Sequence, residues 1–515
     1  MTSAYIAVAA WVCLCLGAFA QNTYTIDLSK RYQRIDNFGA SDCWTAQTVG
    51  RFPDAKRDQI ADWLFSTAVG TNGQPLGIGL SLWRFNVGAG SAEQGRASGI
   101  SDPEHRSECF LLADGRYDWG KQAGQRWFLQ AAKRRGVERF LAFCNSAPVH
   151  LTANGLANNK GRPKDGPYNL KPDRYEAFAD FLATVLAEVG AREGVSFDAV
   201  SPFNEPEWEW DSPKQEGSPA RVGDIARLVR ALDLKLAERK LETKILVTES
   251  GKTDYLIQPK TDRPKQDNQI AELFGPMSPN MIGLLPHVPR LVAGHGYWTT
   301  APNDVLLAKR KALREKLDAH RLGYWQTEVC IMGNDKEIGG GAGRDVAMKT
   351  ALYVARLIHY DLCVAQASAW QWWLGMSYSD YKDGLVYVKP LAGGTDGEVA
   401  DSRLLWSFGN FSRFIRPGAV RIGVSSQQAD VNDPEGLMVS AFLHEDGRLL
   451  TCVMVNMADR DCPVRLAVPG LHILKSGTYL TSDLEGAKLR PHADATPLAL
   501  YAVPARSVVT WVGRF

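Results

Sequence analysis

Two glutamates in the sequence directly follow apolar runs that read as buried strands. Glu205 stands in the run Asn204-Glu205-Pro206, and Glu328 follows Thr327. Two carboxyl groups about 5–5.5 Å apart can cleave a glycosidic bond with retention, one as nucleophile and the other first as acid and then as base. The acid needs a raised pKa, which a poorly solvated site and a nearby anion provide. We therefore predict that both glutamates are catalytic.

Other polar and aromatic residues follow the remaining apolar runs. An asparagine before the acid can hydrogen-bond the sugar 2-hydroxyl, and this contact strengthens in the transition state. Arginine and tyrosine near the nucleophile would hold it ionised and oriented, while flat indole faces match the C–H faces of a pyranose ring. The predicted substrate-binding residues are Asp42, Trp44, Arg84, Asn145, Asn204, His295, Tyr297, Trp370 and Trp372.

The tryptophans of the last apolar run need a separate prediction. Trp370 and Trp372 point to the same side of a strand, because side chains alternate there. We expect at least one of them to face the mouth of the site. Trp83, Trp127 and Trp373 are interpreted as core residues.

Three further glutamates compete for roles in the site. Glu249, in Val247-Thr248-Glu249-Ser250, is the main rival nucleophile, and otherwise a subsite or ion-pair residue. Glu207 and Glu209 are interpreted as loop residues or substrate contacts. Asn-Glu-Pro alone is a weak signal, since three residues recur by chance. Its position after a fourth strand, together with Thr327-Glu328 after a seventh, strengthens the interpretation.

Short apolar runs alternate with amphipathic stretches through most of the chain. Helical spacing of apolar residues marks 174–189, 222–240 and 345–360. Strand and helix repeated eight times indicate a (β/α)8 barrel, and a doubly wound sheet is the alternative. No Gly-x-Gly-x-x-Gly follows an early strand, so a dinucleotide fold has no support. The eight predicted strands are Ile35–Phe38, Leu80–Phe85, Arg139–Phe143, Ala199–Phe203, Ile245–Thr248, Leu291–Gly294, Leu322–Gln326 and Ala367–Trp373.

After about Phe414 the helical periodicity stops, and short alternating runs predict a β-sandwich. We divide the chain into a signal peptide (1–20), an N-terminal strand that completes the sandwich (21–34), the barrel (35–413) and the sandwich (414–515). The junction is rich in large apolar residues, so we expect the sandwich to pack on the barrel as a fixed support, not to swing on a linker. The predicted sandwich strands are Thr23–Leu28, Ala419–Val424, Leu437–Leu443, Leu449–Val455, Val464–Val468, Thr478–Thr481 and Ser507–Val512.

Composition excludes several classes of protein. The 515 residues include 59 basic and 57 acidic ones with no long run of either sign, which argues against a nucleic-acid partner. The apolar run ending in Ala18-Phe19-Ala20 predicts cleavage near Ala20 and a secreted or periplasmic protein. No later stretch approaches the roughly 20 apolar residues of a membrane span. No metal-ligand spacing occurs, so no metal or other cofactor is expected. Seven cysteines follow the leader, an odd number that leaves room for one disulfide without pairing it.

The chain resembles glycoside hydrolase family 30. The resemblance covers nearly the whole chain after the leader and implies a (β/α)8 retaining enzyme with a β side domain. It makes Glu205 the acid/base and Glu328 the nucleophile. Within the family the sequence is most similar to the endo-β-1,6-galactanase branch. The matching segments are Asp36-Asn37-Phe38-Gly39-Ala40-Ser41, Leu82-Trp83-Arg84-Phe85-Asn86, Asn145-Ser146-Ala147-Pro148, Ser201-Pro202-Phe203-Asn204-Glu205-Pro206, Gln215-Glu216-Gly217, His295-Gly296-Tyr297, Trp325-Gln326-Thr327-Glu328, 405–414 and 503–510.

The resulting functional prediction is a secreted retaining hydrolase of a β-linked glycan, with β-1,6-galactan as the leading substrate. A β-1,6-glucanase and an exo-acting β-glycosidase of xylosidase or fucosidase type are alternatives. A non-catalytic carbohydrate-binding barrel is a different class, but such a protein need not keep both Glu205 and Glu328. A metal-dependent hydrolase would need ligands at several strand ends, where the sequence offers only His295.

Overall fold

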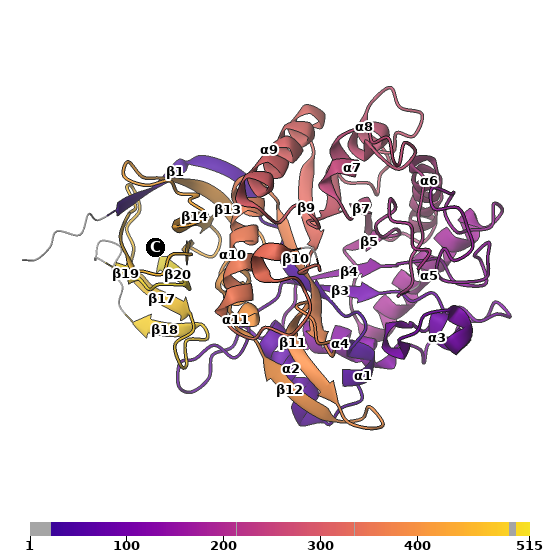
Figure 1. Cartoon of the computed structure of the whole chain (residues 1–515), viewed down its shortest axis with the longest axis horizontal. Helices are drawn as coiled ribbons and strands as arrows, with labels where there is room; N and C mark the ends of the chain where they lie inside the picture. Colours follow the sequence, from indigo (N-terminus) through magenta and orange to yellow (C-terminus); the bar gives the residue numbers. More distant parts are fainter. Residues whose placement is uncertain (1–21, 213, 334, 494–500) are drawn as a thin grey trace, which may run out of the picture.

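A computed structural model describes residues 22–212, 214–333, 335–493 and 501–515. The predicted signal peptide lies outside the described residues. The chain forms a barrel of parallel strands wrapped by helices and a β-sandwich beside it (Figure 1). The predicted fold class is confirmed.

The barrel strands pair in parallel in the order of the sequence, and the last strand pairs with the first. The observed strand ends differ from the predicted ones by up to three residues, apart from the fifth and eighth strands. The barrel strands are β2 (Asn37–Ser41), β3 (Leu82–Asn86), β4 (Arg139–Phe143), β5 (Ala199–Ser201), β6 (Lys244–Ile245), β7 (Thr248–Ser250), β8 (Leu291–His295), β9 (Gly323–Glu328) and β10 (Ala369–Ser377).

The predicted fifth strand, Ile245–Thr248, is divided into two pieces. β6 pairs with β5, and β7 pairs with β8. Between the pieces, the Leu246 amide donates to the Val200 carbonyl, and the Ala293 amide donates to the Val247 carbonyl. The divided strand therefore closes the barrel between its fourth and sixth strands.

Helices follow the strands around the outside of the barrel. Each predicted amphipathic stretch forms a helix, because its apolar stripe packs on the strands. The longer helices are α2 (Asp54–Phe65), α4 (Ala123–Arg134), α5 (Tyr175–Glu193), α6 (Val222–Glu238), α9 (Asn303–His320), α10 (Met348–Cys363) and α11 (Arg403–Ser412). The short ones are α1 (Ala46–Val49), α3 (Ser91–Gln94), α7 (Thr253–Ile257), α8 (Gln269–Phe274) and the 3-10 turns η1 (Gly95–Ser98), η2 (Pro103–His105) and η3 (Lys336–Ile338).

The eighth strand runs four residues beyond its predicted end at Trp373. Its additional residues pair in parallel with β11 (Gly384–Pro390), which forms a hairpin with β12 (Gly397–Asp401). The sequence analysis did not predict this hairpin. Pairing with β11 gives Leu374–Ser377 the hydrogen-bond partners that keep them extended, so the strand continues past the barrel rim.

The sandwich is built from one nine-stranded sheet that includes the N-terminal strand β1, seen as an indigo ribbon beside the strands of the C-terminal part in Figure 1. β1 pairs antiparallel with β13 and parallel with β16. Of these strands, β18 and β19 were not predicted, since each is only three or four residues long. The sheet contains β1 (Asn22–Arg34), β13 (Val420–Ser425), β14 (Leu437–His444), β15 (Leu449–Asn456), β16 (Cys462–Ala467), β17 (Lys475–Thr481), β18 (Arg490–Ala493), β19 (Tyr501–Val503) and β20 (Ser507–Arg514).

Sandwich residues contribute to the hydrophobic core of the barrel, and the sandwich has a second core inside it. Alternation along β14 sends Met438 and Phe442 into the core of the barrel, while Val439 and Ala441 fill the inside of the sandwich. On α11, the Asn410 side-chain amide donates to the Tyr479 carbonyl and to the Thr510 hydroxyl, both at 3.0 Å. This packing agrees with the expected fixed support.

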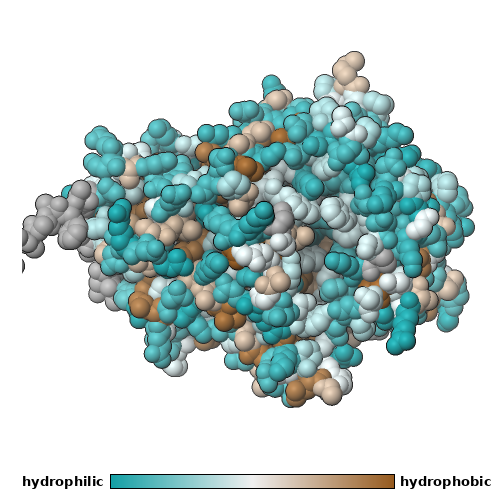
Figure 2. Space-filling view, viewed as in Figure 1, coloured by the Kyte–Doolittle hydropathy of each residue, from teal (hydrophilic) through white to brown (hydrophobic). Residues whose placement is uncertain are grey.

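Apolar residues are concentrated in these cores, and the face seen in Figure 2 is mainly hydrophilic with scattered hydrophobic residues. Among the described residues, no helix is both long and apolar enough to cross a bilayer. The seven cysteines in the described part of the chain are free thiols.

Candidate active site

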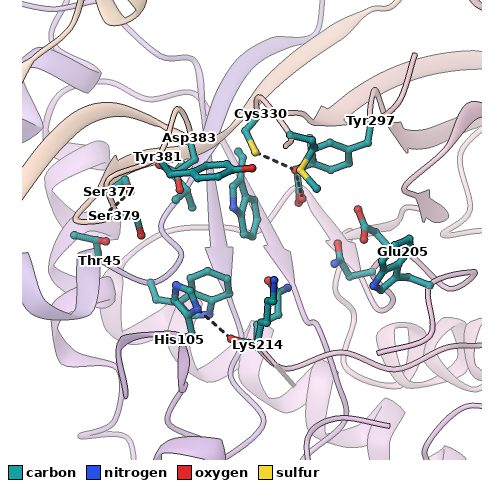
Figure 3. A pocket seen from close by; sticks show the side chains of 18 of the residues that line it. Thr45, His105, Glu205, Lys214, Tyr297, Cys330, Ser377, Ser379, Tyr381 and Asp383 are labelled. Carbon is teal, nitrogen blue, oxygen red and sulfur yellow. Dashed lines mark hydrogen bonds between the residues drawn. The ribbon is translucent and has the colours of Figure 1, made fainter. Parts of the chain in front are cut away.

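A cleft of about 670 Å³ opens at the carboxyl ends of the barrel strands (Figure 3). Glu205, four residues after the end of β5, and Glu328, the last residue of β9, both line it. Parallel strands deliver their C-terminal residues to one edge, so residues 123 positions apart meet there. The aromatic and sulfur-bearing residues of the lining are Trp44, His105, Trp208, Trp210, Tyr297, Trp298, Cys330, Met332, Trp373, Tyr378 and Tyr381.

Glu328 is held by two donors. The Arg84 guanidinium lies 2.5 Å from one carboxylate oxygen, and the Tyr297 hydroxyl donates to the other at 3.0 Å. Arg84 is fully buried, with its guanidinium carbon 3.8 Å from the centre of the Phe143 ring. The two contacts fix the orientation of the carboxylate, as a nucleophile requires.

Glu205 lies in a less polar environment. A ring nitrogen of His295 lies 3.1 Å from one carboxyl oxygen. Burial raises the pKa of Glu205, while His295 opposes that shift and Glu328 adds to it. Space beside the carboxyl is tight, since a Cβ on residue 251 would lie 2.9 Å from its carbon, and Gly251 supplies the needed room. The surroundings of Glu205 therefore favour the protonated form of its carboxyl group.

The two carboxyl groups are close enough to act on one bond. One oxygen of Glu205, one oxygen of Glu328 and a ring nitrogen of His295 lie within 4.8 Å of one another. Such spacing fits the pair of a retaining glycosidase and leaves too little room for the water of an inverting one.

His295 is fully buried among three carboxylates. Burial opposes its charge, but Glu328 and hydrogen bonds to Glu205 and Glu249 raise the pKa of His295 to about 10. The ring is therefore an imidazolium at neutral pH. Although the spacing of these groups could suit a metal, a protonated histidine has no lone pair for one.

Glu249, the rival nucleophile, lies outside the cleft. Its side chain is fully buried, and the hydroxyls of Ser201 and Thr327 donate to its two oxygens. Burial would raise its pKa, but hydrogen bonding to His295 and the charge of Arg84 lower the pKa of Glu249 to about 2. It has no open face toward a substrate, so its geometry fits the ion-pair interpretation.

Glu207 and Glu209 are bound by residues of neighbouring segments. Glu207 is buried and accepts hydrogen bonds from the Ser250 hydroxyl and the Lys252 amide, both at 3.0 Å. Glu209 forms ion pairs with Lys164 and Arg263. These contacts agree with the loop interpretation.

The remaining predicted polar residues occupy different depths. Asn204 lines the cleft, and its Oδ1 atom accepts no hydrogen bond from any described residue. Asn145 is buried behind the cleft, and neither side-chain polar atom has a partner among the described residues. Asp42 is also sealed from the cleft, where it accepts a hydrogen bond from the Asn86 amide at 2.8 Å. That geometry corrects its predicted role from substrate binding to support of the strand ends.

The strand-eight tryptophans require a larger correction. Trp370 and Trp372 are fully buried and do not line the cleft. The Trp370 indole donates to Asp361 of α10 at 2.9 Å, and the Trp372 indole donates to the carbonyl of the residue before β11 at 2.7 Å. Trp373, interpreted from sequence as a core residue, lines the cleft instead, edge to face with Trp44 at 5.6 Å between centroids. Alternation places Trp370 and Trp372 opposite to Trp373, but it does not indicate which side faces the site.

Several cleft residues were missed by the sequence analysis. Trp208 and Trp298 stack with centroids 5.4 Å apart and planes at 17°, beside Glu205. His105 packs on Trp44 at 4.4 Å on another part of the wall. Trp208 lies three residues after Glu205, and Trp298 lies one residue after Tyr297. Their closeness in sequence to predicted site residues could have indicated that they line the cleft.

The architecture and this carboxyl pair define an O-glycosyl hydrolase. The profile of O-glycosyl hydrolase family 30 matches residues 21–387, and that of the family 30 β-sandwich domain matches residues 418–511. The chain belongs to glycoside hydrolase family 30.

Three similar proteins illustrate the relationship. An endo-β-1,6-galactanase from Hypocrea rufa is 28% identical over 256 residues, which are 47% of this chain and 52% of the relative. The chain thus spans about half the length of that curated relative. The crystal structure of a conserved exported protein from Bacteroides fragilis matches with a TM-score of 0.87 and 34% identity over 95% of this chain and 100% of the other. The catalytic domain of a family 30 xylanase C from Talaromyces cellulolyticus matches with a TM-score of 0.69 and 24% identity over 96% and 100%.

Proposed function

We propose that the protein is a retaining endo-glycosidase that cleaves a β-1,6-linked galactan. The observation that carries the catalytic part is the separation of the Glu205 and Glu328 oxygens, which is under 4.8 Å within one open cleft. The relative from Hypocrea rufa supports the choice of galactan. The apolar leader supports export from the cell.

Two displacements at the anomeric carbon complete the reaction. In the first, an oxygen of ionised Glu328 forms a bond to C1 while the bond from C1 to the bridging oxygen breaks, and Glu205 gives its proton to that oxygen. In the second, Glu205 takes a proton from water, whose oxygen replaces Glu328 at C1. The two inversions restore the original configuration, and both glutamates return to their starting protonation states.

The neighbouring residues prepare these steps. Arg84 and Tyr297 hold Glu328 in a fixed orientation, while burial raises the pKa of Glu205 and so favours its protonated form. Asn204 lines the cleft and its Oδ1 has no donor among the described residues, so it is suited to accept a hydrogen bond from the sugar 2-hydroxyl. Trp373 and the stacked pair Trp208 and Trp298 offer faces on which sugar rings can lie.

A reducing-sugar assay on β-1,6-galactan, β-1,6-glucan, arabinogalactan and glucuronoxylan tests the substrate. We expect release of oligosaccharides from the galactan, and NMR of the first product should give the β-anomer. Release from the glucan alone would select the β-1,6-glucanase alternative, and release of single sugars would select exo action. An α-anomer would contradict retention, and binding without cleavage would select the carbohydrate-binding alternative.

A further inference from the structure

One buried carboxylate on the cleft wall has no part in the reaction described above. Asp383, the residue before β11, lines the cleft and is only 8% exposed. Figure 3 places it with Tyr381, Ser377 and Ser379 on the side of the cavity away from Glu205. Neither sequence spacing nor the catalytic pair accounts for an acid at this position.

The Asp383 side chain lacks a protein partner for one of its oxygens. Oδ1 is buried and accepts no hydrogen bond from any described residue, and no cation within the described ranges lies at ion-pair distance. Burial raises the pKa of Asp383 to about 6, against smaller opposing effects of Ser377, its own backbone and Arg344. The group is thus ionised at neutral pH. A buried anion of this kind is costly unless something donates to it.

The surrounding strands hold Asp383 in place. The Trp372 indole donates to its carbonyl at 2.7 Å, and the Leu374 amide donates to the same oxygen at 3.3 Å. Leu374 is also paired with Gly384 across β10 and β11. These contacts flank Trp373 on both sides in sequence, so they fix Asp383 relative to the indole that lines the cleft. Its backbone carbonyl is therefore occupied and Ser377 hydrogen-bonds the carboxylate, while Oδ1 has no donor among the described residues.

The position of Asp383 indicates which part of a glycan it can meet. Glu328 must approach C1 of the glycone, the sugar that becomes bound to the enzyme, and Glu205 must reach the bridging oxygen toward the leaving group. Tyr297 connects Glu328 with Cys330, since its hydroxyl also lies 3.8 Å from the Cys330 sulfur. The amide of Ile331, the residue after Cys330, donates to the Lys382 carbonyl at 3.3 Å, which joins the chain before Asp383 to the chain that follows Glu328. Asp383 therefore lies on the glycone side.

We propose that Asp383 is a specificity-determining residue that accepts a hydrogen bond from a glycone hydroxyl on C3, C4 or C6. This inference rests on the proposed function, because it assigns a substrate group to the same cleft. A carboxylate accepts but does not donate, so it selects a sugar that offers a hydroxyl at this edge and disfavours one that lacks it.

The test compares dinitrophenyl β-galactosides that carry all hydroxyls with their 3-deoxy, 4-deoxy and 6-deoxy forms. If the polysaccharide assay selects a glucan, the glucose series is used. For wild type, loss of the hydroxyl bound by Asp383 should lower kcat/KM by about 10- to 100-fold. For Asp383→Ala the same loss should cost less than about twofold, because the partner is already absent. The ratio of two substrates on one preparation does not depend on the folded fraction.

Asp446→Asn is the control, since it removes the same charge from an exposed aspartate in the turn before β15, away from the residues that line the cleft. It should keep the wild-type pattern of discrimination. If wild type is active and Asp383→Ala keeps full discrimination at all three positions, the Asp383 inference is wrong while the proposed function stands. A wild type that cleaves neither sugar series nor any of the polysaccharides overturns both.

Discussion

Two regions meet at His295, and they shift the pKa of a glutamate in opposite directions. On the open side, Glu205 and Glu328 line the cleft. On the sealed side, Glu249 has no exposed surface. All three are glutamates at or just after the ends of barrel strands, and each has an oxygen within 3.7 Å of a ring nitrogen of His295.

The charges and donors around each carboxyl group, more than burial, distinguish the two regions. Burial opposes the charge of Glu249, but the hydrogen bond to His295, the charge of Arg84 and the Ser201 hydroxyl lower its pKa to about 2. Glu205 receives only the ring at its carboxyl group, and burial raises its pKa. Glu328 and the hydrogen bonds to Glu205 and Glu249 keep His295 charged, whereas the raised pKa of Glu205 favours a proton that can be transferred.

Substitution of the nucleophile should have the largest effect. Glu328→Gln removes the attacking oxygen without changing side-chain volume, so we expect kcat to fall by about 10³-fold or more with little change in the thermal midpoint. Azide should partly restore activity to Glu328→Ala and give a product of inverted configuration. Near-normal activity of Glu328→Gln would show that another residue is the nucleophile.

Substitution of the acid should depend on the leaving group. We expect Glu205→Ala to lower the rate of glycosylation by about 10²- to 10⁴-fold for poor leaving groups, which need the proton, and by much less for dinitrophenyl glycosides. The active form of Glu205 is protonated and exists below its pKa. Because that pKa is raised, wild-type kcat/KM should fall with rising pH only above the usual carboxyl range. Equal losses for good and poor leaving groups would contradict the assignment.

Glu249→Gln should affect stability more than chemistry. The change leaves His295 with one fewer carboxylate and breaks a buried pair, so denaturant unfolding should show a loss of about 3–5 kcal/mol. The folded pKa of about 2 lies below the ordinary value of 4.5, so wild type holds this stabilisation above pH 4.5 and loses it as pH falls toward 2. The variant should lack that pH dependence. Lost activity at unchanged stability would instead place Glu249 in the chemistry.

The smallest effect is expected at the edge of the open region. Trp208 is 42% exposed and stacks on Trp298, so Trp208→Ala removes one sugar-binding face without opening the core. We expect about a tenfold rise in KM for the polysaccharide. Dinitrophenyl glycosides, which end near the bond that is cleaved, provide the internal control and should change less than about twofold. Equal changes would indicate a general distortion of the cleft.

Local sequence determined much of the fold and the position of the carboxyl pair. Apolar runs separated by amphipathic stretches fix eight strands and their helices, because each run must be buried and each helix must cover the sheet. Once the strands are parallel, their last residues share one rim, so Glu205 and Glu328 could be paired from their positions alone. The hairpin after β10 escaped prediction, because it depends on pairing with residues beyond the barrel rim.

Tertiary structure decided which residues face the cleft and how they are charged. Sequence alternation separates Trp370 and Trp372 from Trp373, but only the packed structure shows that the first two are buried outside the cleft. Likewise, Trp208 and Trp298 stack across 90 positions because two loops meet above the barrel. Glu205 and Glu249 are the same residue type, and the donors that distinguish their proton affinities come from distant strands. Sequence spacing specifies which side chains share a face of a strand, whereas the closed barrel sets the burial, the partners and the charge of each side chain.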